Sequence, residues 1–433
     1  MNVDTICALA TAPGGAIGMI RISGPQSLEI LSHVFTKNIS DAPANTIHYG
    51  HIVATVPDGS PSGIIDEVMV SIFRAPHSYT GEDSVEISCH GSRYILNKVL
   101  ELLIENGCRQ AGPGEFTQRA YLNGKMDLSQ AEAVADLIAS TNQATHKIAM
   151  SQLRGHFSSR LAQLREQLLK LTSLLELELD FSDHEDLEFA DRSELKELTQ
   201  TIYQHITQLA DSFHAGNAIK NGIPVAIIGA PNVGKSTLLN ALVGEERAIV
   251  SDIQGTTRDA IEDTIQLSGI TFRFIDTAGI RHTDDQIELM GIDRSIAAAK
   301  RALIIIMMTE PGKPYPDIKV RDDQTIIRIE NKTEQFQAKF GVGLDELRQN
   351  LIDAAPKTTD ADVIVTSSRH YEALIRANEH LQRVIDGLEM QLSGDLLSED
   401  LRLTLDALAE ITGGQITTNE VLGNIFKHFC IGK

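Results

Sequence analysis

The spacing of hydrophobic residues along the chain changes near Leu122. Before this point, short apolar runs such as GMIRISG and SVEISCHG alternate with Gly and Pro turns, and one helical pattern lies near residues 95–104. Runs of this length between turn residues are typical of β-strands. The N-terminal segment is therefore predicted to be an α+β domain.

Helical spacing follows in two separate series. Apolar residues recur at steps of four and three from Phe157 to Leu175 and again from Leu374 to Leu388, with an α/β pattern between them. Because neither apolar stripe can be buried alone, the two series are predicted to pack into one helical domain. The predicted segments are the α+β domain, the first helical half, the α/β insert and the second helical half with the tail, at 1–122, 123–215, 216–357 and 358–433.

The insert carries a phosphate-binding loop. GAPNVGKST, residues 229–237, follows the apolar run VAII and precedes LLNAL, which is the setting of a GxxxxGK[ST] loop. Its glycines let backbone N–H groups point at phosphate, Lys235 reaches the outer phosphates, and the Ser236 hydroxyl faces Mg²⁺. The loop residues expected to contact the nucleotide are Asn232, Val233, Gly234, Lys235, Ser236 and Thr237.

Two further motifs complete a nucleotide switch. DTAG supplies an acidic residue near the metal and a glycine that can turn toward a γ-phosphate, and GTTRD supplies Thr257 as the second hydroxyl on Mg²⁺. Three such motifs in this order predict a Ras-like, doubly wound α/β domain that binds and hydrolyses a nucleotide. The contacts expected from these two motifs come from Gly255, Thr256, Thr257, Asp276, Thr277, Ala278 and Gly279.

The residues that would recognise the base depart from the common NKxD pattern. The chain reads NKTE, with Asn331, Lys332 and Glu334, and the additional methylene of glutamate moves the carboxylate. A candidate second base loop, QAK at 337–339, follows after only two intervening residues, too few for the helix and strand expected there. Either the base pocket is compressed and weak, or one of the two assignments is wrong, or NKTE is an ordinary polar turn.

The group that positions the attacking water also differs from that of small signalling GTPases. Those proteins place a glutamine after DTAG, whereas this chain has Ile280, which can neither donate nor accept a hydrogen bond. The nearby acidic candidates are Asp284, Asp285 and Glu288. The alternative is that all three are solvated charges of a switch loop.

Composition narrows the setting of this activity. The longest apolar run, Ala302 to Met308, is far shorter than the about 20 residues of a membrane-spanning helix, and the N-terminus lacks the basic region of a secretory signal. Four cysteines without a CxxC pair indicate reduced thiols. A formal net charge of -21 argues against a general nucleic-acid binder, so any RNA contact must be local or assisted by a partner. We expect a cytoplasmic protein without membrane contact.

The last five residues, FCIGK, place Cys430 fourth from the end. A prenylation signal has a cysteine at that position, but it also needs two aliphatic residues and a permitted last residue, and Gly432 and Lys433 do not fit. The sequence leaves open whether Cys430 is a functional thiol or a small packing residue.

These motifs together point to a known family. Beyond GAPNVGKST, GTTRD and DTAGIR, the chain contains RISG, TGEDSVE, PGEFTQRAYLNGKMDL and the FCIGK tail. Over essentially its whole length it resembles the bacterial and organellar MnmE (TrmE) family of tRNA modification GTPases. The resemblance implies a folate-binding N-terminal domain that also forms a homodimer, a helical domain built from the middle and C-terminal segments, and an inserted G domain.

The resemblance also implies an activity and its partners. In a heterotetramer with an FAD-dependent protein of the GidA (MnmG) family, such proteins add an aminomethyl or carboxymethylaminomethyl group to C5 of the wobble uridine of certain tRNAs. The one-carbon unit comes from 5,10-methylene- or 5-formyl-tetrahydrofolate. GTP hydrolysis uses Mg²⁺ and is activated by K⁺ and by dimerisation of the G domains.

The family's motifs assign roles to particular residues of this chain. Glu288 matches the water-positioning glutamate, and Cys430 is expected near the one-carbon unit. Mg²⁺ is expected on Ser236 and Thr257, and K⁺ on Asn232, Ser251, Ile253 and Thr256. The expected folate-binding residues are Arg21, Glu86, Lys125 and Lys433.

Two other functions are compatible with the motifs. One is a switch GTPase that acts in ribosome assembly or another binding role, without one-carbon chemistry. The other is a folate-dependent aminomethyltransferase whose G domain is only regulatory. Folate binding excludes the first, and a requirement for GTP hydrolysis during tRNA modification excludes the second.

Overall fold

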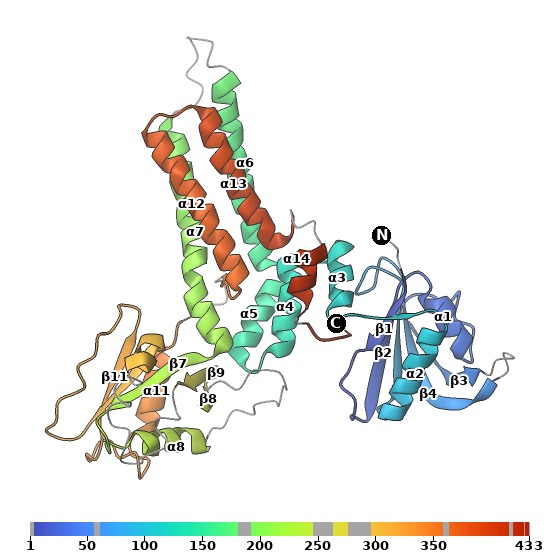
Figure 1. The fold of residues 1–433 in the computed structure, drawn as a ribbon, viewed down its shortest axis with the longest axis horizontal. Helices are drawn as coiled ribbons and strands as arrows, with labels where there is room; N and C mark the ends of the chain where they lie inside the picture. The colour runs from blue at the N-terminus through green and yellow to red at the C-terminus, as the bar shows by residue number, and fades with distance from the viewer. Residues whose placement is uncertain are drawn as a thin grey trace. The chain divides into compact units, whose positions relative to one another are not determined.

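The computed structural model of the protein describes residues 4–55, 61–180, 192–245, 263–275, 296–357, 363–414, 419–427 and 429–432. The chain divides into two compact units. The first comprises Met1–Ile138, Gln152–Leu161 and Asp406–Lys433, and the second comprises Ala139–Ser151 and Ala162–Leu405. Figure 1 traces the chain by colour from one terminus to the other.

The first unit is built on a six-stranded sheet in the order β3-β4-β5-β2-β1-β6. Neighbouring strands are antiparallel except β1 and β6, which are parallel. The strands and the two helices that pack on them are β1 Ile6–Leu9, β2 Ile17–Ser23, α1 Ser27–Val34, β3 Thr46–Thr55, β4 Pro61–Phe73, β5 Ser84–His90, α2 Arg93–Glu105 and β6 Arg109–Gln110. This α+β arrangement agrees with the short apolar runs of the N-terminal sequence.

The two faces of this sheet differ in burial. Ile20 and Ile22 of β2 are buried in a cluster with side chains of α1 and α2. Because successive side chains of a strand point to opposite faces, Arg21 lies on the other face. On that outer face, Tyr49 and Met69 are cross-strand partners and are 50% and 46% exposed. One face is thus a core face, whereas the other is covered at β1, where Ile6 and Ala8 are buried with Phe116, and is exposed at β3 and β4.

The last helix of the chain packs in the same unit as the N-terminal sheet. α3 Glu115–Leu122 and α4 Leu128–Ala139 follow the sheet in sequence, and α14 Asn419–Phe426 packs against both (Figure 1). Leu422 and Phe426 of α14 share a buried cluster with residues of α4. The tail that follows α14 forms an isolated β-bridge at Pro113, which precedes α3.

Helices from both sides of the insert pack together in the second unit. The other described helices outside the insert are α5 Gln143–Leu153, α6 His156–Asp180, α7 Arg192–Asn221, α12 Ser368–Glu389 and α13 Gly394–Thr412. α7 and α12 are antiparallel, because Lys196 pairs with Glu389 at 2.7 Å and Asn378 donates to Thr207 at 3.0 Å. The predicted apolar stripes of α6 and α12 are buried, which confirms their helical spacing. Among the described residues, no helix is long and apolar enough to cross a membrane.

The insert folds as a five-stranded sheet in the order β11-β10-β7-β9-β8. β8 is antiparallel to β9, and the other neighbours are parallel. The elements are β7 Ile223–Gly229, α8 Lys235–Glu245, β8 Asp263–Leu267, β9 Ile270–Phe274, β10 Ile304–Thr309, β11 Thr325–Glu330 and α11 Leu344–Ala354. Every residue of β10 is buried, as a central parallel strand covered on both faces requires. Most of the apolar run at Ala302 to Met308 thus belongs to a buried strand, which begins at Ile304.

Candidate functional site

The phosphate loop connects β7 to α8 at the carboxyl end of the parallel strands. β7 ends at Gly229 and α8 begins at Lys235, so the N–H groups of the first helical turn lie at the loop, where they favour an anion. The Lys235 ammonium donates to the carbonyls of Gly229 and Ala230 at 2.8 and 2.9 Å. Burial lowers the pKa of Lys235. An anionic ligand would offset the free-energy cost of burying the charged ammonium group.

Close approaches by neighbouring atoms explain the two glycines of the loop. A Cβ on Gly229 would lie 2.6 Å from the carbonyl oxygen of Met308, in the neighbouring strand. Gly234 has a φ of 103°, and a Cβ there would lie 2.5 Å from Nδ2 of Asn331. Both distances are too short for any side chain. The motif GxxxxG therefore reflects how tightly the loop is packed between β10 and Asn331.

Asn331 connects the phosphate loop to the second predicted base loop. Its side chain is buried, its Nδ2 donates to the Val233 carbonyl at 2.7 Å, and its Oδ1 accepts from the Ala338 N–H at 3.1 Å. In residues 331–343, all of which the structure describes, there is no helix and no strand beyond one isolated bridge. NKTE and QAK are therefore adjacent in space, joined by a short connection that contains no helix or strand. That either segment contacts a base stays a prediction.

Lys332 and Glu334 of NKTE are exposed, in contrast to the buried Asn331. Lys332 has a φ of 68°, and its ammonium pairs with Glu310, which follows β10. Hydrogen bonds from Lys313 and Lys332 lower the pKa of Glu310 to about 2, so this carboxylate is ionised at neutral pH. Glu334 is exposed in the bend that follows. A carboxylate in this position is accessible to a ligand but is not held by the core.

A second polar cluster lies on the outer face of the N-terminal sheet. Arg21 of β2 and Glu86 of β5 are cross-strand partners, and Nη2 and Oε1 are 2.7 Å apart. The guanidinium carbon lies 5.2 Å from the ring centroid of Tyr79 and 5.6 Å from that of Phe116, within the range of cation–π attraction. A guanidinium, a carboxylate and two aromatic rings can together hold a flat ligand that forms hydrogen bonds.

The C-terminal tail reaches this second cluster. The carbonyl oxygen of Gly432 lies 3.5 Å from Nη1 of Arg21. Gly432 has a φ of 94°, and a Cβ there would lie 2.0 Å from the carbonyl oxygen of Leu9 in β1. Only glycine lets the tail lie this close to the strand. Cys430 is exposed, whereas the other three cysteines are buried.

Lys125 lies along the segment that precedes β5. Its ammonium donates to the Pro76 carbonyl at 2.9 Å, and its Cδ and Cγ lie 3.4 Å from the position of a Cβ on Gly81. Among the residues predicted to bind folate, the structure joins Arg21 directly to Glu86 and places Lys125 beside Gly81.

The aromatic residues of this cluster were missed from the sequence. Tyr79 directly precedes TGEDSVE, and Phe116 lies inside PGEFTQRAYLNGKMDL. An aromatic residue within or beside a motif assigned to a flat ligand is the signal that could have identified them.

Several predicted site residues lie outside the part of the chain that the structure describes. They are Ser251, Ile253, Gly255, Thr256, Thr257, Asp276, Thr277, Ala278, Gly279, Glu288 and Lys433, with the alternatives Asp284 and Asp285. Their roles stay predictions.

Comparison with known proteins accounts for nearly the whole chain. Residues 5–125 match the family described as GTP-binding protein TrmE N-terminus, and residues 128–430 match the MnmE helical domain. A relative from Bacteroides thetaiotaomicron, named tRNA modification GTPase MnmE, is 53% identical, with 100% of both chains covered. The chain belongs to the MnmE family. MnmE relatives from Phocaeicola vulgatus and Porphyromonas gingivalis are 51% and 48% identical, cover 100% of this chain, and are themselves covered to 99% and 98%.

The MnmE relatives also contain residues that this chain lacks. The alignment with the MnmE of Parabacteroides distasonis covers 100% of both chains but runs over 467 positions, whereas this chain has 433 residues.

Proposed function

We propose that this chain hydrolyses GTP and, with an FAD-dependent partner of the GidA (MnmG) type in a heterotetramer, modifies C5 of the wobble uridine of tRNA with a one-carbon unit from a reduced folate. The names of the MnmE relatives support the GTPase and tRNA parts. The observation that carries the folate part is the contact between the Gly432 carbonyl and the Arg21 guanidinium. It brings the tail that contains Cys430 to the Arg21–Glu86 pair. A switch GTPase without one-carbon chemistry does not require a cysteine-containing tail beside this ion pair.

The insert is the proposed G domain. Lys235 and the first turn of α8 would bind the phosphates of GTP, and Ser236 and Thr257 would hold Mg²⁺, which neutralises phosphate charge. The exposed Asn232, with a φ of 61°, presents an amide oxygen in the loop. Oxygen donors suit a hard cation. The expected K⁺ ligands are Asn232, Ser251, Ile253 and Thr256, and K⁺ there would supply the charge that an arginine finger supplies in other GTPases.

Replacing Glu334 by aspartate is expected to increase the preference for GTP over ATP. The buried Asn331 fixes the start of the NKTE segment beside the phosphate loop, but the longer side chain of Glu334 moves the carboxylate from the guanine edge. Because a hydrogen bond to a charged group contributes about 1.5–3 kcal/mol, the ratio of GTP to ATP affinity should rise about tenfold. Calorimetric titration with each nucleotide measures the ratio. Glu330→Asp, on an exposed residue of β11, is the control, and an unchanged ratio in Glu334→Asp would show that this carboxylate does not read the base.

The outer face of the N-terminal sheet is the proposed homodimer surface. Ile47, Tyr49 and Met69 are 63%, 50% and 46% exposed on it. Pairing of β3 with β4, β4 with β5 and β5 with β2 puts Ile47 in the same cross-strand row as Glu86 and Arg21. A second copy on this face would bury the apolar side chains and would lie beside the folate site.

The side chains of the second cluster fit a reduced folate. Glu86 can accept hydrogen bonds from the N–H groups of a pterin ring, and Tyr79 offers an aromatic surface. Arg21, Lys125 and Lys433 can pair with the anionic groups of folate. The exposed Cys430 thiol lies in the tail that reaches Arg21, where it can act as a nucleophile or an acid. A bound reduced folate would supply a one-carbon unit at the oxidation level of formaldehyde or formate.

Folate binding is the experiment that tests this proposal. Equilibrium dialysis with 5-formyltetrahydrofolate is expected to show binding by the natural protein and binding about tenfold weaker or worse in Arg21→Ala, because a charged hydrogen-bonding partner is lost. Arg93→Ala is the control, since Arg93 is exposed at the start of α2, a helix on the opposite face of the sheet. A natural protein that binds no reduced folate would favour the switch GTPase.

A further inference from the structure

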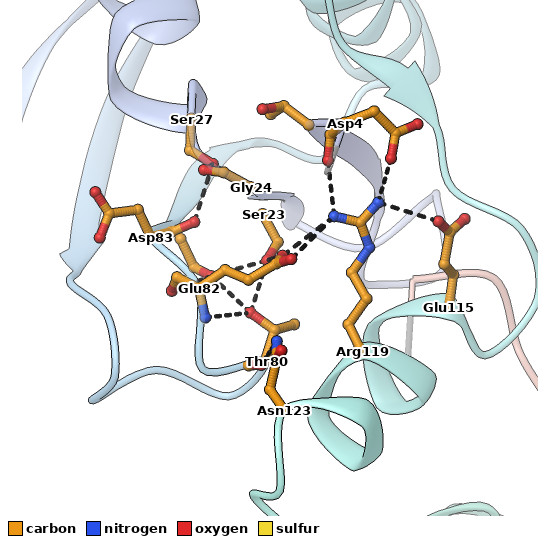
Figure 2. A network of polar contacts seen from close by, with 12 residues as sticks. Asp4, Ser23, Gly24, Ser27, Thr80, Glu82, Asp83, Glu115, Arg119 and Asn123 are labelled. Carbon is orange, nitrogen blue, oxygen red and sulfur yellow. Dashed lines mark hydrogen bonds and ion pairs between the residues drawn. The ribbon is translucent and has the colours of Figure 1, made fainter. Parts of the chain in front are cut away.

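An ion-pair network in the N-terminal domain links α3 to the segment that precedes β5 (Figure 2). The Arg119 side chain of α3 is only 11% exposed. Its Nη2 lies 2.6 Å from Asp4 Oδ1 and 3.3 Å from Glu115 Oε1, and its Nη1 lies 3.2 Å from both carboxylate oxygens of Glu82. A charge this deeply buried is stable only when it is paired. The network therefore fixes its members relative to one another.

Glu82 extends this network into a group of buried hydroxyls. Its Oε2 accepts a hydrogen bond from the Ser23 hydroxyl at 2.7 Å, and Ser23 Oγ lies 2.7 Å from Thr80 Oγ1. The Asn123 amide, just beyond α3, donates to the Thr80 carbonyl at 2.8 Å (Figure 2). α3 and the residue just beyond it thus contact the TGED segment, residues 80–83, at two points, Glu82 and Thr80.

The same helix and the same segment carry the two aromatic rings that contact Arg21. Phe116 lies one helical turn before Arg119, and Tyr79 directly precedes Thr80. The Tyr79 hydroxyl lies 2.8 Å from Oγ1 of Thr117, so it too joins the segment to the helix. A shift of the TGED segment relative to α3 would move the Tyr79 ring relative to the Phe116 ring, and the Arg21 guanidinium contacts both rings.

We propose that Arg119 and Glu82 are positioning residues of the folate site, an inference that rests on the proposed function. Their ion pair sets the distance between α3 and the TGED segment, and that distance sets where Tyr79 and Phe116 hold Arg21. Neither Arg119 nor Glu82 needs to touch folate, because each acts through the aromatic rings. Precise placement of this kind is what supporting residues contribute to a binding site.

Glu82→Gln tests the inference with little risk to folding, because the Arg119 charge keeps Asp4 and Glu115 as partners. It is expected to weaken binding of 5-formyltetrahydrofolate about tenfold, the scale for a lost charged hydrogen bond. Combined with Tyr79→Leu, its effect should be less than additive, because both changes act on one contact. In the protein without folate, amide hydrogen exchange of residues 78–84 should be faster in Glu82→Gln.

Arg109→Gln is the matched control from the same cluster. Arg109 pairs with Asp4 and Glu115, as Arg119 does, but among the described residues it does not pair with Glu82. It should leave folate affinity and the exchange of residues 78–84 unchanged. Equal affinity in Glu82→Gln and the natural protein, or equal losses in Glu82→Gln and Arg109→Gln, would overturn the positioning role. A natural protein that binds no folate would instead overturn the proposed function on which it rests.

Discussion

Replacing Glu288 by alanine is expected to lower the GTP turnover number by about 10² or more, the scale for loss of a positioned acid, base or orienting group. Ile280 stands where signalling GTPases carry the glutamine that orients water, and it cannot form that hydrogen bond. The resemblance to MnmE proteins predicts this role for Glu288. Because this carboxylate would act on water rather than on the nucleotide, affinity for GTP should stay nearly unchanged. Steady-state hydrolysis in potassium and titration with a non-hydrolysable GTP analogue measure the two quantities.

Asp284→Ala and Asp285→Ala are the matched controls for Glu288, because they remove neighbouring carboxylates from the same sequence. Both should retain turnover. Normal turnover in Glu288→Ala would return the role to one of these aspartates.

The same assay with sodium in place of potassium should lower turnover of the natural protein, since Asn232 and its partners are proposed to hold K⁺. Equal rates in the two salts would remove potassium from the mechanism.

Replacing Cys430 by serine is expected to lower tRNA modification by about 10² or more, the scale for a group that assists covalent or proton-transfer chemistry. Cys430 is exposed two residues before Gly432, whose carbonyl lies 3.5 Å from Arg21. An exposed thiol contributes little packing, so folding, GTP hydrolysis and folate binding should be retained. Modification assays with the FAD-dependent partner, tRNA and methylene-tetrahydrofolate measure the effect.

The control for Cys430 is a change in the same tail that removes no thiol. Ile431→Val trims a side chain that is 53% exposed and should leave modification unchanged. Undiminished modification in Cys430→Ser would show that the thiol takes no part in the reaction. A lipid-modified C-terminus in mass spectrometry would overturn the assignment of the tail to the folate site.

The fold was predictable where one pattern of burial was continuous. The apolar run of β10 and the helical stripe of α12 are buried. β3 was not identified because its sequence, TIHYGHIVAT, does not alternate cleanly. Ile47 and Tyr49 point to the outer face and are exposed, so apolar residues lie on both sides of the strand. Because this face is proposed to contact a second copy, it carries apolar residues where a solvent-facing strand would carry polar ones. The alternation of apolar and polar residues on which strand prediction depends is therefore weak in this strand.

The candidate site was predictable where its residues form one contiguous motif. Lys235 and Ser236 follow directly from GxxxxGK[ST]. The Arg119 network was not predictable, because Asp4 and Glu82 are distant in sequence and meet Arg119 only after the sheet and α3 have packed. The contact of Asn331 with Ala338 was missed for the opposite reason. The two residues are close in sequence, and an expected helix and strand made their direct contact look improbable.

The most direct measurement follows a radiolabelled one-carbon unit from methylene-tetrahydrofolate to tRNA in the presence of the FAD-dependent partner. Label is expected in the wobble uridine when GTP and potassium are present, and it should fall with a non-hydrolysable GTP analogue and in Arg21→Ala, but not in Arg93→Ala. Continued GTP hydrolysis with no label in the tRNA of the natural protein would contradict the proposal that this chain couples GTP hydrolysis to folate-dependent tRNA modification.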